Sequence, residues 1–170
     1  MLAEIYWITD SLAMMPRPRG NDWLEDEIIS YKNYGIDIVV SLLKRSEIYE
    51  LEIEKEEIWC SEKGIIFLNF PIVDRQVPES FEETLKFVEK LKSLIEESKK
   101  IAIHCRQGIG RSSLIASSIL VLQGFSVKNA FEKIVKARGC EVPDTKEQID
   151  WVKLFAQKVA NQNNHVLQDF

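Results

Sequence analysis

Short apolar runs alternate with helical segments along this chain of 170 residues. Four of the runs have the length and composition of β-strands, and loop and helix signals follow each of them. They are Ile5–Ile8, Ile36–Leu42, Ile65–Phe70 and Ile101–His104. Because strands that alternate with helices usually pair in parallel, we expect an α/β fold with a central, mostly parallel sheet of four to five strands and helices on both faces.

Six helices are predicted between and after these strands. Ser80 and Glu83 have the spacing of a capping box at the start of one helix. The segment that begins at Ser112 is apolar on most of its sides, which is typical of a helix at the centre of a domain. The predicted helices are Asp22–Tyr34, Ser46–Lys63, Ser80–Ser98, Ser112–Gln123, Val127–Arg138 and Thr145–Ala160.

The chain shows one composition throughout, with no internal repeat and no low-complexity linker. Since about 150 residues is an ordinary domain length, we expect one domain that covers residues 1–160. The tail 161–170 is rich in amide side chains and is predicted to fray.

Charge and hydropathy exclude several classes of protein. The chain has 22 Lys and Arg against 27 Asp and Glu, a net charge of −5, which argues against the broad basic surface of a nucleic-acid-binding protein. The apolar stretch Leu114–Leu122 contains two serines and is far shorter than the ~20 residues that span a bilayer. The first residues lack the basic-then-apolar order of a secretory signal. We expect no nucleic-acid partner, no membrane span and no export.

The chain has three cysteines, Cys60, Cys105 and Cys140. An odd and sparse set of cysteines does not form a disulfide framework and is typical of a reducing compartment. We therefore expect a cytoplasmic protein, in which Cys60 and Cys140 are structural or surface thiols.

The strand Ile101–His104 leads into a loop with two glycines and then into an apolar helix. Ligands of such sheets bind at the carboxyl ends of the strands. Backbone N–H groups at a helix N-terminus form a nest that suits a phosphate group. We expect a phosphate-binding loop made of Arg106, Gln107, Gly108, Ile109, Gly110 and Arg111.

Cys105 opens this loop and Arg111 closes it. A thiol beside oriented amides and a guanidinium ionises readily, and the thiolate is the nucleophilic form. The planar guanidinium of Arg111 can bind two phosphoryl oxygens at once. Ser112 is placed to donate a hydrogen bond to the cysteine sulfur when that sulfur leaves. A structural cysteine is the alternative interpretation of Cys105, but it does not explain why glycines and an arginine surround it.

The segment His104–Ser112 matches His-Cys-x-x-Gly-x-x-Arg-Ser and resembles the signature of the cysteine-dependent protein tyrosine phosphatase superfamily. The chain is most similar to its compact dual-specificity members, especially the cyclin-dependent kinase inhibitor-associated kind. The resemblance extends from Ile5 to about Trp151. It implies a phosphatase-type fold, a dual-specificity or tyrosine phosphatase-like catalytic domain at residues 1–160, and a supporting role for His104, which would hydrogen-bond the loop backbone and orient Cys105.

Zinc binding is a second interpretation of the adjacent His104 and Cys105. The chain has one other histidine, His165, in the predicted tail, and neighbouring residues on a strand point to opposite faces. We therefore expect no metal site. The phosphatase reaction itself requires neither a metal nor an organic cofactor.

Cleavage of a phosphate ester needs an acid that protonates the leaving oxygen. Asp74 lies in a proline-flanked loop after a predicted strand, so we expect it at the same edge of the sheet as Cys105. An ordinary turn residue is the alternative interpretation of Asp74. The Trp-Pro-Asp triplet of the family is absent, and Arg75 and Gln76 stand where the similar phosphatases have small residues, which leaves the substrate preference open.

Gln148 has two interpretations. Members of the family often carry a downstream glutamine that orients the hydrolytic water, and the region around Gln148 looks similar to theirs. Thr145 and Gln148 also have the spacing of a capping box, which explains both residues without catalysis.

The resulting hypothesis is a phosphatase that acts on phosphotyrosine and on phosphoserine or phosphothreonine of a protein partner, through a phosphocysteine intermediate. A phosphoinositide phosphatase is an alternative, although Arg106 is the only additional basic residue of the loop and Ile109 stands where a charge would help. A catalytically silent phosphate-binding module is another, but Cys105, Arg111 and Asp74 are all present.

The acidity of the chain is concentrated in one segment. Residues 46–62 contain seven acidic residues and one basic residue, whereas the rest of the chain is nearly neutral. We expect this segment to be one solvated helical face that contributes to solubility.

Overall fold

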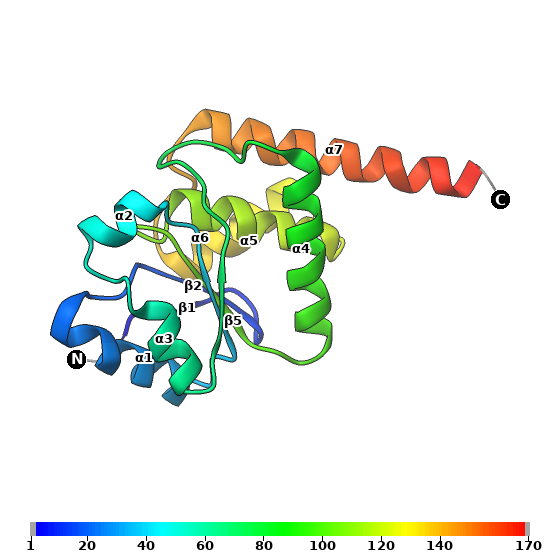
Figure 1. The fold of residues 1–170 in the computed structure, drawn as a ribbon. Helices are drawn as coiled ribbons and strands as arrows, with labels where there is room; N and C mark the ends of the chain where they lie inside the picture. Colours follow the sequence, from blue (N-terminus) through cyan, green and yellow to red (C-terminus); the bar gives the residue numbers. More distant parts are fainter. Residues whose placement is uncertain (1–2, 169–170) are drawn as a thin grey trace.

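Five strands form one sheet, which lies between two layers of helices (Figure 1). The computed structural model describes residues 3–168. The strand order is β1-β2-β5-β3-β4, with β1 and β2 antiparallel and the other neighbours parallel. The predicted α/β fold with a mostly parallel sheet is confirmed. The strands are β1 (Tyr6–Trp7), β2 (Leu12–Met15), β3 (Ile38–Ser41), β4 (Ile66–Asn69) and β5 (Ile101–His104).

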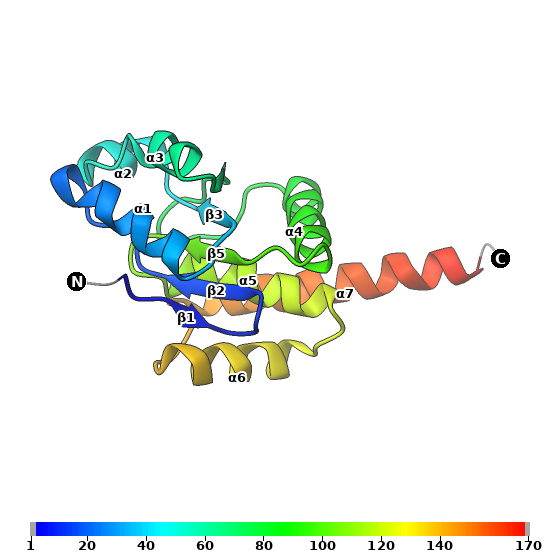
Figure 2. The same ribbon diagram turned by 90° about the horizontal axis from the view of Figure 1, so that it is seen from below.

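The helices cover both faces of the sheet (Figure 2). The first three, α1 to α3, lie on one face, and α4 to α7 lie on the other. A short 3₁₀ helix, η1 (Asn21–Trp23), precedes α1. The α-helices are α1 (Leu24–Asn33), α2 (Arg45–Glu50), α3 (Glu56–Glu62), α4 (Phe81–Glu96), α5 (Gly110–Leu122), α6 (Val127–Arg138) and α7 (Lys146–Gln168).

The residues of β2 illustrate how the sheet contributes to both layers. Leu12 and Met14 pack into the core that includes α4 to α7, whereas Ala13 and Met15 pack into the core that includes α1 and α3. All four are buried. Because successive side chains of a strand point to opposite faces, a strand covered on both sides needs apolar residues at every position. This explains the continuous apolar runs of the sequence.

Helix α5 lies at the centre of the layer formed by α4 to α7, as its apolar sequence predicts. Its residues are buried from Gly110 to Leu120. Ser117 and Ser118 donate hydrogen bonds to the carbonyl oxygen of Leu114 at 3.0 and 2.8 Å, which satisfies their buried hydroxyls. The buried helix anchors the loop that precedes it at the end of the sheet.

Strand β2 is the element that the sequence does not predict. Its residues, Leu-Ala-Met-Met, favour helices more than strands when taken alone. The strand forms because β1 and β5 lie on either side of it, with Leu12 opposite Ile101 and Met15 opposite His104. Pairing with these two strands outweighs the preference of the β2 residues for a helix.

The single helix predicted over Ser46–Lys63 is wrong, because this segment forms two helices, α2 and α3. Glu52 between them has a positive φ of 57°, and its carbonyl oxygen accepts a hydrogen bond from the Asn21 N–H at 3.0 Å. A Cβ on Gly20 would lie 2.2 Å from the carbonyl oxygen of Leu51. Contact with the loop at residues 20–21 therefore breaks the helix.

The prediction that the last helix ends at Ala160 and that a frayed tail follows is also wrong, because α7 continues through Gln168. No glycine or proline occurs in residues 146–168 to stop the helix. The end of α7 projects away from the rest of the domain (Figure 1). Within residues 3–168, no helix is both long and apolar enough to cross a membrane.

Candidate active site

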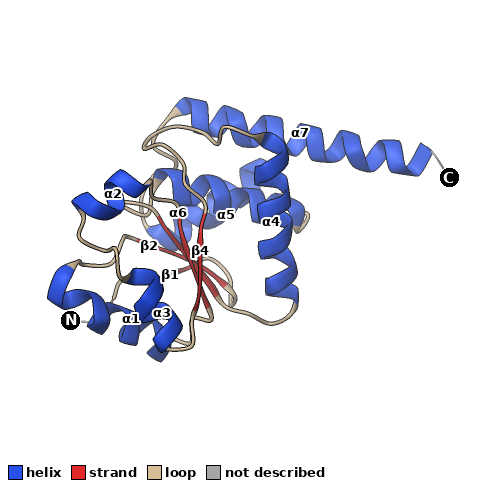
Figure 3. Ribbon diagram, viewed as in Figure 1, coloured by secondary structure: helices blue, strands red, loops and turns tan. Residues whose placement is uncertain are grey.

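The residues expected to carry the chemistry lie in or beside the loops that leave the carboxyl ends of the central parallel strands, and Figure 3 shows these loops in tan. A cavity of about 140 Å³ opens between the loop after β5, the loop after β4 and the segment before α7. Cys105, Arg111 and Asp74 share this cavity, as the sequence predicts. The lining residues are Asp74, Arg75, Cys105, Arg106, Gln107, Gly110, Arg111 and Asp144.

Other atoms approach the backbone of both glycines of the phosphate-binding loop closely. Gly108 has a φ of +69°, and a Cβ there would lie 2.4 Å from the carbonyl oxygen of Met15. A Cβ on Gly110 would lie 2.1 Å from Oδ2 of Asp144. Gly108 is therefore required for the loop to pack against β2, whereas a larger residue at position 110 would have to displace the exposed Asp144 side chain.

Arg138, the last residue of α6, holds the outer side of this loop. Its Nε donates to the carbonyl oxygen of Gly108 and its Nη2 to that of Gln107, both at 3.0 Å. The guanidinium carbon also lies 4.0 Å from the centre of the Tyr6 ring, a cation–π contact. Because a peptide is planar and trans, the N–H groups that follow these two carbonyls point away from Arg138.

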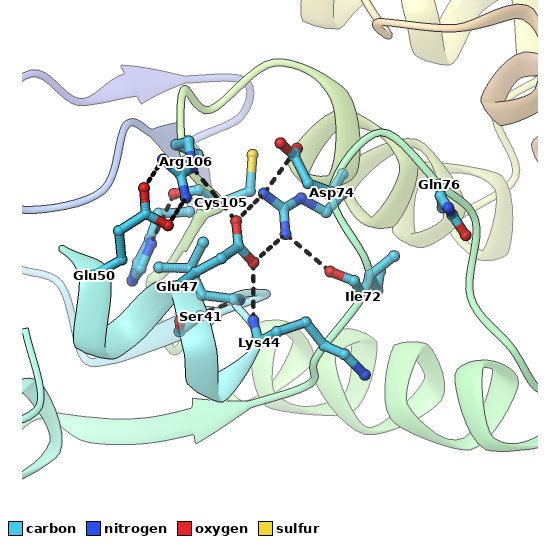
Figure 4. Close-up of polar contacts among 12 residues, drawn as sticks. Ser41, Lys44, Glu47, Glu50, Ile72, Asp74, Gln76, Cys105 and Arg106 are labelled. Carbon is cyan, nitrogen blue, oxygen red and sulfur yellow. Dashed lines mark hydrogen bonds and ion pairs between the residues drawn. The ribbon is translucent and has the colours of Figure 1, made fainter.

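The Arg111 guanidinium is buried, and the residues that hold it, Glu47, Ile72 and Asp74, are labelled in Figure 4. Its Nη1 and Nη2 donate to the two carboxylate oxygens of Glu47 at 2.8 and 2.9 Å. Nη1 also donates to the carbonyl oxygen of Ile72 at 2.8 Å, and Nη2 lies 3.0 Å from Oδ1 of Asp74. This geometry orients the guanidinium toward the cavity before any ligand binds.

Arg111 and Glu47 remain charged as a pair. Burial disfavours the charge of Arg111, but Glu47, Cys105 and Asp74 outweigh burial and raise its pKa. Burial likewise acts to raise the pKa of Glu47, but hydrogen bonds from Arg111 and from the Lys44 backbone lower it below its usual value.

Arg106 faces α2 and not the centre of the loop. Its guanidinium donates to the carboxylate of Glu50 at 2.9 and 3.3 Å and to Glu47 at 3.5 Å. Figure 4 shows these contacts beside Cys105. Arg106 therefore fixes the start of the phosphate-binding loop to α2.

Asp74 lies in a sharply bent loop, in which the next residue, Arg75, has a φ of +60°. About half of the Asp74 side chain is exposed, so the carboxylate can reach solvent as well as the cavity. The Cys105 thiol and the Asp74 carboxylate lie on the same side of the site (Figure 4). The Asp74 carboxyl group and the Cys105 thiol therefore line one cavity, as expected from their place at the same edge of the sheet.

Gln148 is buried and forms the predicted capping box. Its Oε1 accepts from the Thr145 N–H at 3.3 Å, and its own N–H donates to Thr145 Oγ1 at 3.2 Å. Its Nε2 donates to the carbonyl oxygen of Gln76 at 3.1 Å, which ties the start of α7 to the acid loop. Asp144, and not Gln148, lines the cavity.

The remaining predicted residues lie behind the loop. His104 Nδ1 is 3.2 Å from the carbonyl oxygen of Cys105, so it contacts the loop backbone as the resemblance implies. Ser112 Oγ is buried, and within the described part of the chain it has no hydrogen-bond partner. Among residues 3–168, no group of three or more His, Cys, Asp or Glu side chains is arranged to hold a metal ion.

The other two cysteines lie outside the cavity. Burial, together with the charges of Glu56 and Glu57, raises the pKa of the Cys60 thiol far above its ordinary value. Cys140 is partly exposed, and the three cysteines are free thiols. Cys105 is the one cysteine that lines the cavity.

A family model described as "Polymorphic toxin system, DSP-PTPase phosphatase" matches residues 13–125, which is more than half of the chain. The chain belongs to this DSP-PTPase phosphatase family. The resemblance expected from His104–Ser112 is confirmed, and the match extends from β2 through α5.

Two relatives of this chain illustrate the similarity in sequence. The viral protein 197R of Invertebrate iridescent virus 6, named as a tyrosine phosphatase, is 34% identical over 102 residues, which are 58% of this chain and 37% of the viral protein. Cyclin-dependent kinase inhibitor 3 of Mus musculus is 28% identical over 130 residues, 76% of this chain and 61% of the relative. The chain thus covers less than two thirds of either relative.

Solved structures agree with the phosphatase fold. A crystal structure of kinase associated phosphatase, with serine in place of its catalytic cysteine, has a TM-score of 0.85 at 21% identity and covers 94% of this chain and 97% of that one. The active form of Tk-PTP has a TM-score of 0.75 at 27% identity, with coverage of 92% and 99%.

Four residues in or beside the site are missed by sequence reasoning, namely Glu47, Glu56, Arg138 and Asp144. The expectation that residues 46–62 form one solvated face is wrong for Glu47 and Glu56, which are buried against Arg111 and His104. The position of Glu47 in the sequence indicates its place near the site, because Glu47 closely follows β3 and therefore lies at the carboxyl edge of the sheet. Arg138 and Asp144 carry no comparable local signal.

Proposed function

We propose that this phosphatase hydrolyses phosphate monoesters of phosphoproteins, on phosphotyrosine and also on phosphoserine or phosphothreonine, through a phosphocysteine intermediate. The observation that carries the proposal is the shared cavity, which is lined by a thiol, a guanidinium that makes two hydrogen bonds to Glu47, and a carboxyl group. These are the nucleophile, the electrostatic stabiliser and the acid that this reaction requires.

In the first step, the thiolate of Cys105 attacks phosphorus and the bond from phosphorus to the ester oxygen breaks. Arg111 and the loop N–H groups bind the equatorial oxygens, whose charge develops in the transition state. Asp74 gives its proton to the leaving oxygen. In the structure, Asp74 Oδ1 lies 3.0 Å from Arg111 Nη2. When the substrate binds, a phosphoryl oxygen replaces Asp74 in this contact.

In the second step, water attacks the phosphocysteine and the S–P bond breaks. The ionised Asp74 accepts a proton from the water, and inorganic phosphate is released. Ser112 donates its hydroxyl hydrogen bond to the departing sulfur. This role suits a buried hydroxyl that has no other partner within residues 3–168.

A protein substrate is favoured over a phosphoinositide by the charges of the loop. Arg106 is its only additional basic residue, and the Glu50 and Glu47 carboxylates already neutralise it. A polyanionic headgroup would therefore meet no free cation at Arg106. A silent phosphate-binding module is not favoured, since thiol, guanidinium and acid share the cavity.

We place the protein in the cytoplasm, because a nucleophilic thiol works only in its reduced form and the three cysteines are free. The reaction as written needs neither a metal ion nor an organic cofactor.

The experiment is a comparison of phosphate release from matched substrates. Wild type, Cys105→Ser and, as a matched control, Cys140→Ser are each given a phosphotyrosine peptide, a phosphoserine peptide and an inositol phospholipid. We expect wild type and Cys140→Ser to dephosphorylate the peptides at similar rates and Cys105→Ser to release none. Faster release from the phospholipid would overturn the protein substrate, and release by Cys105→Ser would overturn the nucleophile.

A further inference from the structure

Arg75 differs from the other two arginines that line the cavity. Arg106 and Arg111 both pair with carboxylates of α2. The Arg75 side chain is exposed, and among residues 3–168 it forms no ion pair. Its positive charge is therefore open to a ligand that enters the cavity.

Arg75 also occupies a turn position that ordinarily favours glycine. The Gln76 N–H donates to the carbonyl oxygen of Val73 at 3.0 Å, which closes a turn of four residues. Arg75 is the third residue of this turn and has a φ of +60°. Turns with a positive φ at the third residue usually have glycine or asparagine there, because other side chains are strained. Such strain at a cavity makes Arg75 a candidate for a role beyond the turn itself.

Contacts on both sides of the turn fix its place beside Arg111. Arg111 Nη1 donates to the carbonyl oxygen of Ile72 at 2.8 Å, and Gln148 Nε2 donates to the carbonyl oxygen of Gln76 at 3.1 Å. Ile72 and Gln76 are both labelled in Figure 4. Arg75 lies between these two anchored residues, so its backbone keeps one position relative to the guanidinium of Arg111.

We propose that Arg75 is a specificity-determining residue that binds the carboxylate of an aspartate or glutamate close in sequence to the phosphorylated residue of the substrate. The inference rests on the proposed function, in which Arg111 and the phosphate-binding loop bind the phosphoryl group. A guanidinium is permanently cationic, and its planar N–H groups match the two oxygens of a carboxylate. Once the phosphoryl group is bound, an acidic side chain beside it meets Arg75 at the same cavity.

The charges around Arg75 favour one carboxylate over a group with several phosphates. A single cation balances the single charge of an aspartate or glutamate. Asp144 is exposed and lines the same cavity, so additional phosphates of an inositol headgroup would be repelled by its carboxylate. An acidic peptide therefore fits this site better than a polyphosphorylated lipid.

The first experiment compares two phosphotyrosine peptides that differ only in charge. One has glutamate at the two positions on each side of the phosphotyrosine, and the other has glutamine there. We expect wild type to show a kcat/KM about two- to fivefold higher for the glutamate peptide, the range that an exposed ion pair supports. This ratio should fall toward one at high salt, because exposed charges are screened. A ratio of one at low salt, or a preference for glutamine, would overturn the proposal.

Variants assign the preference to one side chain. Arg75→Asn removes the charge and is tolerated at a positive φ, so the turn is kept. Arg75→Lys keeps the charge but not the planar N–H groups. The control is Arg45→Gln, because Arg45 is an exposed arginine of α2 that does not line the cavity.

We expect the ratio of the two kcat/KM values to be close to one in Arg75→Asn, intermediate in Arg75→Lys and unchanged in Arg45→Gln. A wild-type ratio in Arg75→Asn would overturn the proposal even if both peptides were turned over more slowly. The arginine would then act on the phosphoryl group or on the turn.

An inositol phospholipid with several phosphates completes the series. If Arg75→Asn slows release from this lipid and keeps the wild-type peptide ratio, Arg75 serves a headgroup and the proposal is overturned. The proposed function fails separately, through phosphate release by Cys105→Ser. No release from either peptide by wild type would overturn the proposed function and this inference together. Equal release from both peptides by wild type would overturn only the role of Arg75.

Discussion

The carboxylate of Glu47 binds the guanidinium of Arg111 through two hydrogen bonds of 2.8 and 2.9 Å, although the two residues are 64 positions apart in the sequence. The Arg111 guanidinium can therefore meet a phosphoryl group without first becoming ordered. Pre-organisation of this kind lowers the barrier of the reaction, because the entropy of orientation has already been lost on folding.

Glu47→Gln should therefore reduce kcat/KM for an aryl phosphate by about 10- to 100-fold, the scale expected when a catalytic group is misplaced. Glu54→Gln is the matched control, because Glu54 is exposed between α2 and α3. It should leave kcat/KM unchanged. Equal values for both variants would show that the bidentate contact does not matter to turnover.

The same pair should make stability depend on pH. The pKa of Glu47 is lowered in the folded state. The contribution of Glu47 to the free energy of unfolding is therefore complete above its pKa in the unfolded chain, which is roughly 4.3. It is lost as the pH falls through the lower pKa of the folded state. Urea unfolding of wild type and Glu47→Gln should differ most near neutral pH, and the difference should shrink below about pH 4. A difference that grows on acidification would contradict this account of the pair.

Gly108→Ala should damage the phosphate-binding loop. An alanine at φ +69° is strained, and its Cβ would also meet the Met15 carbonyl oxygen at 2.4 Å. Gly139→Ala provides the control, because its φ of +74° is similar and no described atom lies within 4 Å. The control should lose about 1–2 kcal/mol of unfolding free energy and keep its activity. Gly108→Ala should lose more stability and most of kcat/KM; equal losses in the two variants would rule out the clash.

Asp74→Asn should make turnover sensitive to the leaving group. With phenyl phosphate, whose leaving oxygen needs a proton, we expect a fall in kcat of about 10²- to 10⁴-fold. With 4-nitrophenyl phosphate the fall should be smaller, because 4-nitrophenolate leaves without a proton. Asp144→Asn changes the other carboxyl group of the cavity. If that variant, and not Asp74→Asn, shows this dependence, the acid has been assigned to the wrong residue.

The parts of the site that are local in sequence could be predicted. His104 to Ser112 form one strand-loop-helix unit, and the spacing of its glycines and arginine reflects a local geometry. Asp74 could be placed because the carboxyl ends of parallel strands meet at one edge of the sheet. Strands β3 and β5 are buried on both faces and are recognisable as apolar runs, because such strands need apolar residues at nearly every position.

The parts that depend on distant contacts could not be predicted. Glu47 and Glu56 look like solvated residues in an acidic segment, and only the folded chain brings them to Arg111 and His104. The break between α2 and α3 arises from contact with residues 20–21. Strand β2 owes its conformation to its neighbours and not to its own residues.

The central claim is that Cys105 carries the phosphoryl group during turnover. The direct measurement is mass spectrometry of the enzyme quenched during hydrolysis of an aryl phosphate, followed by fragmentation of the modified peptide. We expect wild type and Cys140→Ser to gain one phosphoryl group on the Cys105 sulfur, and Cys105→Ser to gain none and release no phosphate. A phosphoryl group on any other residue, or turnover by Cys105→Ser at the wild-type rate, would contradict the mechanism.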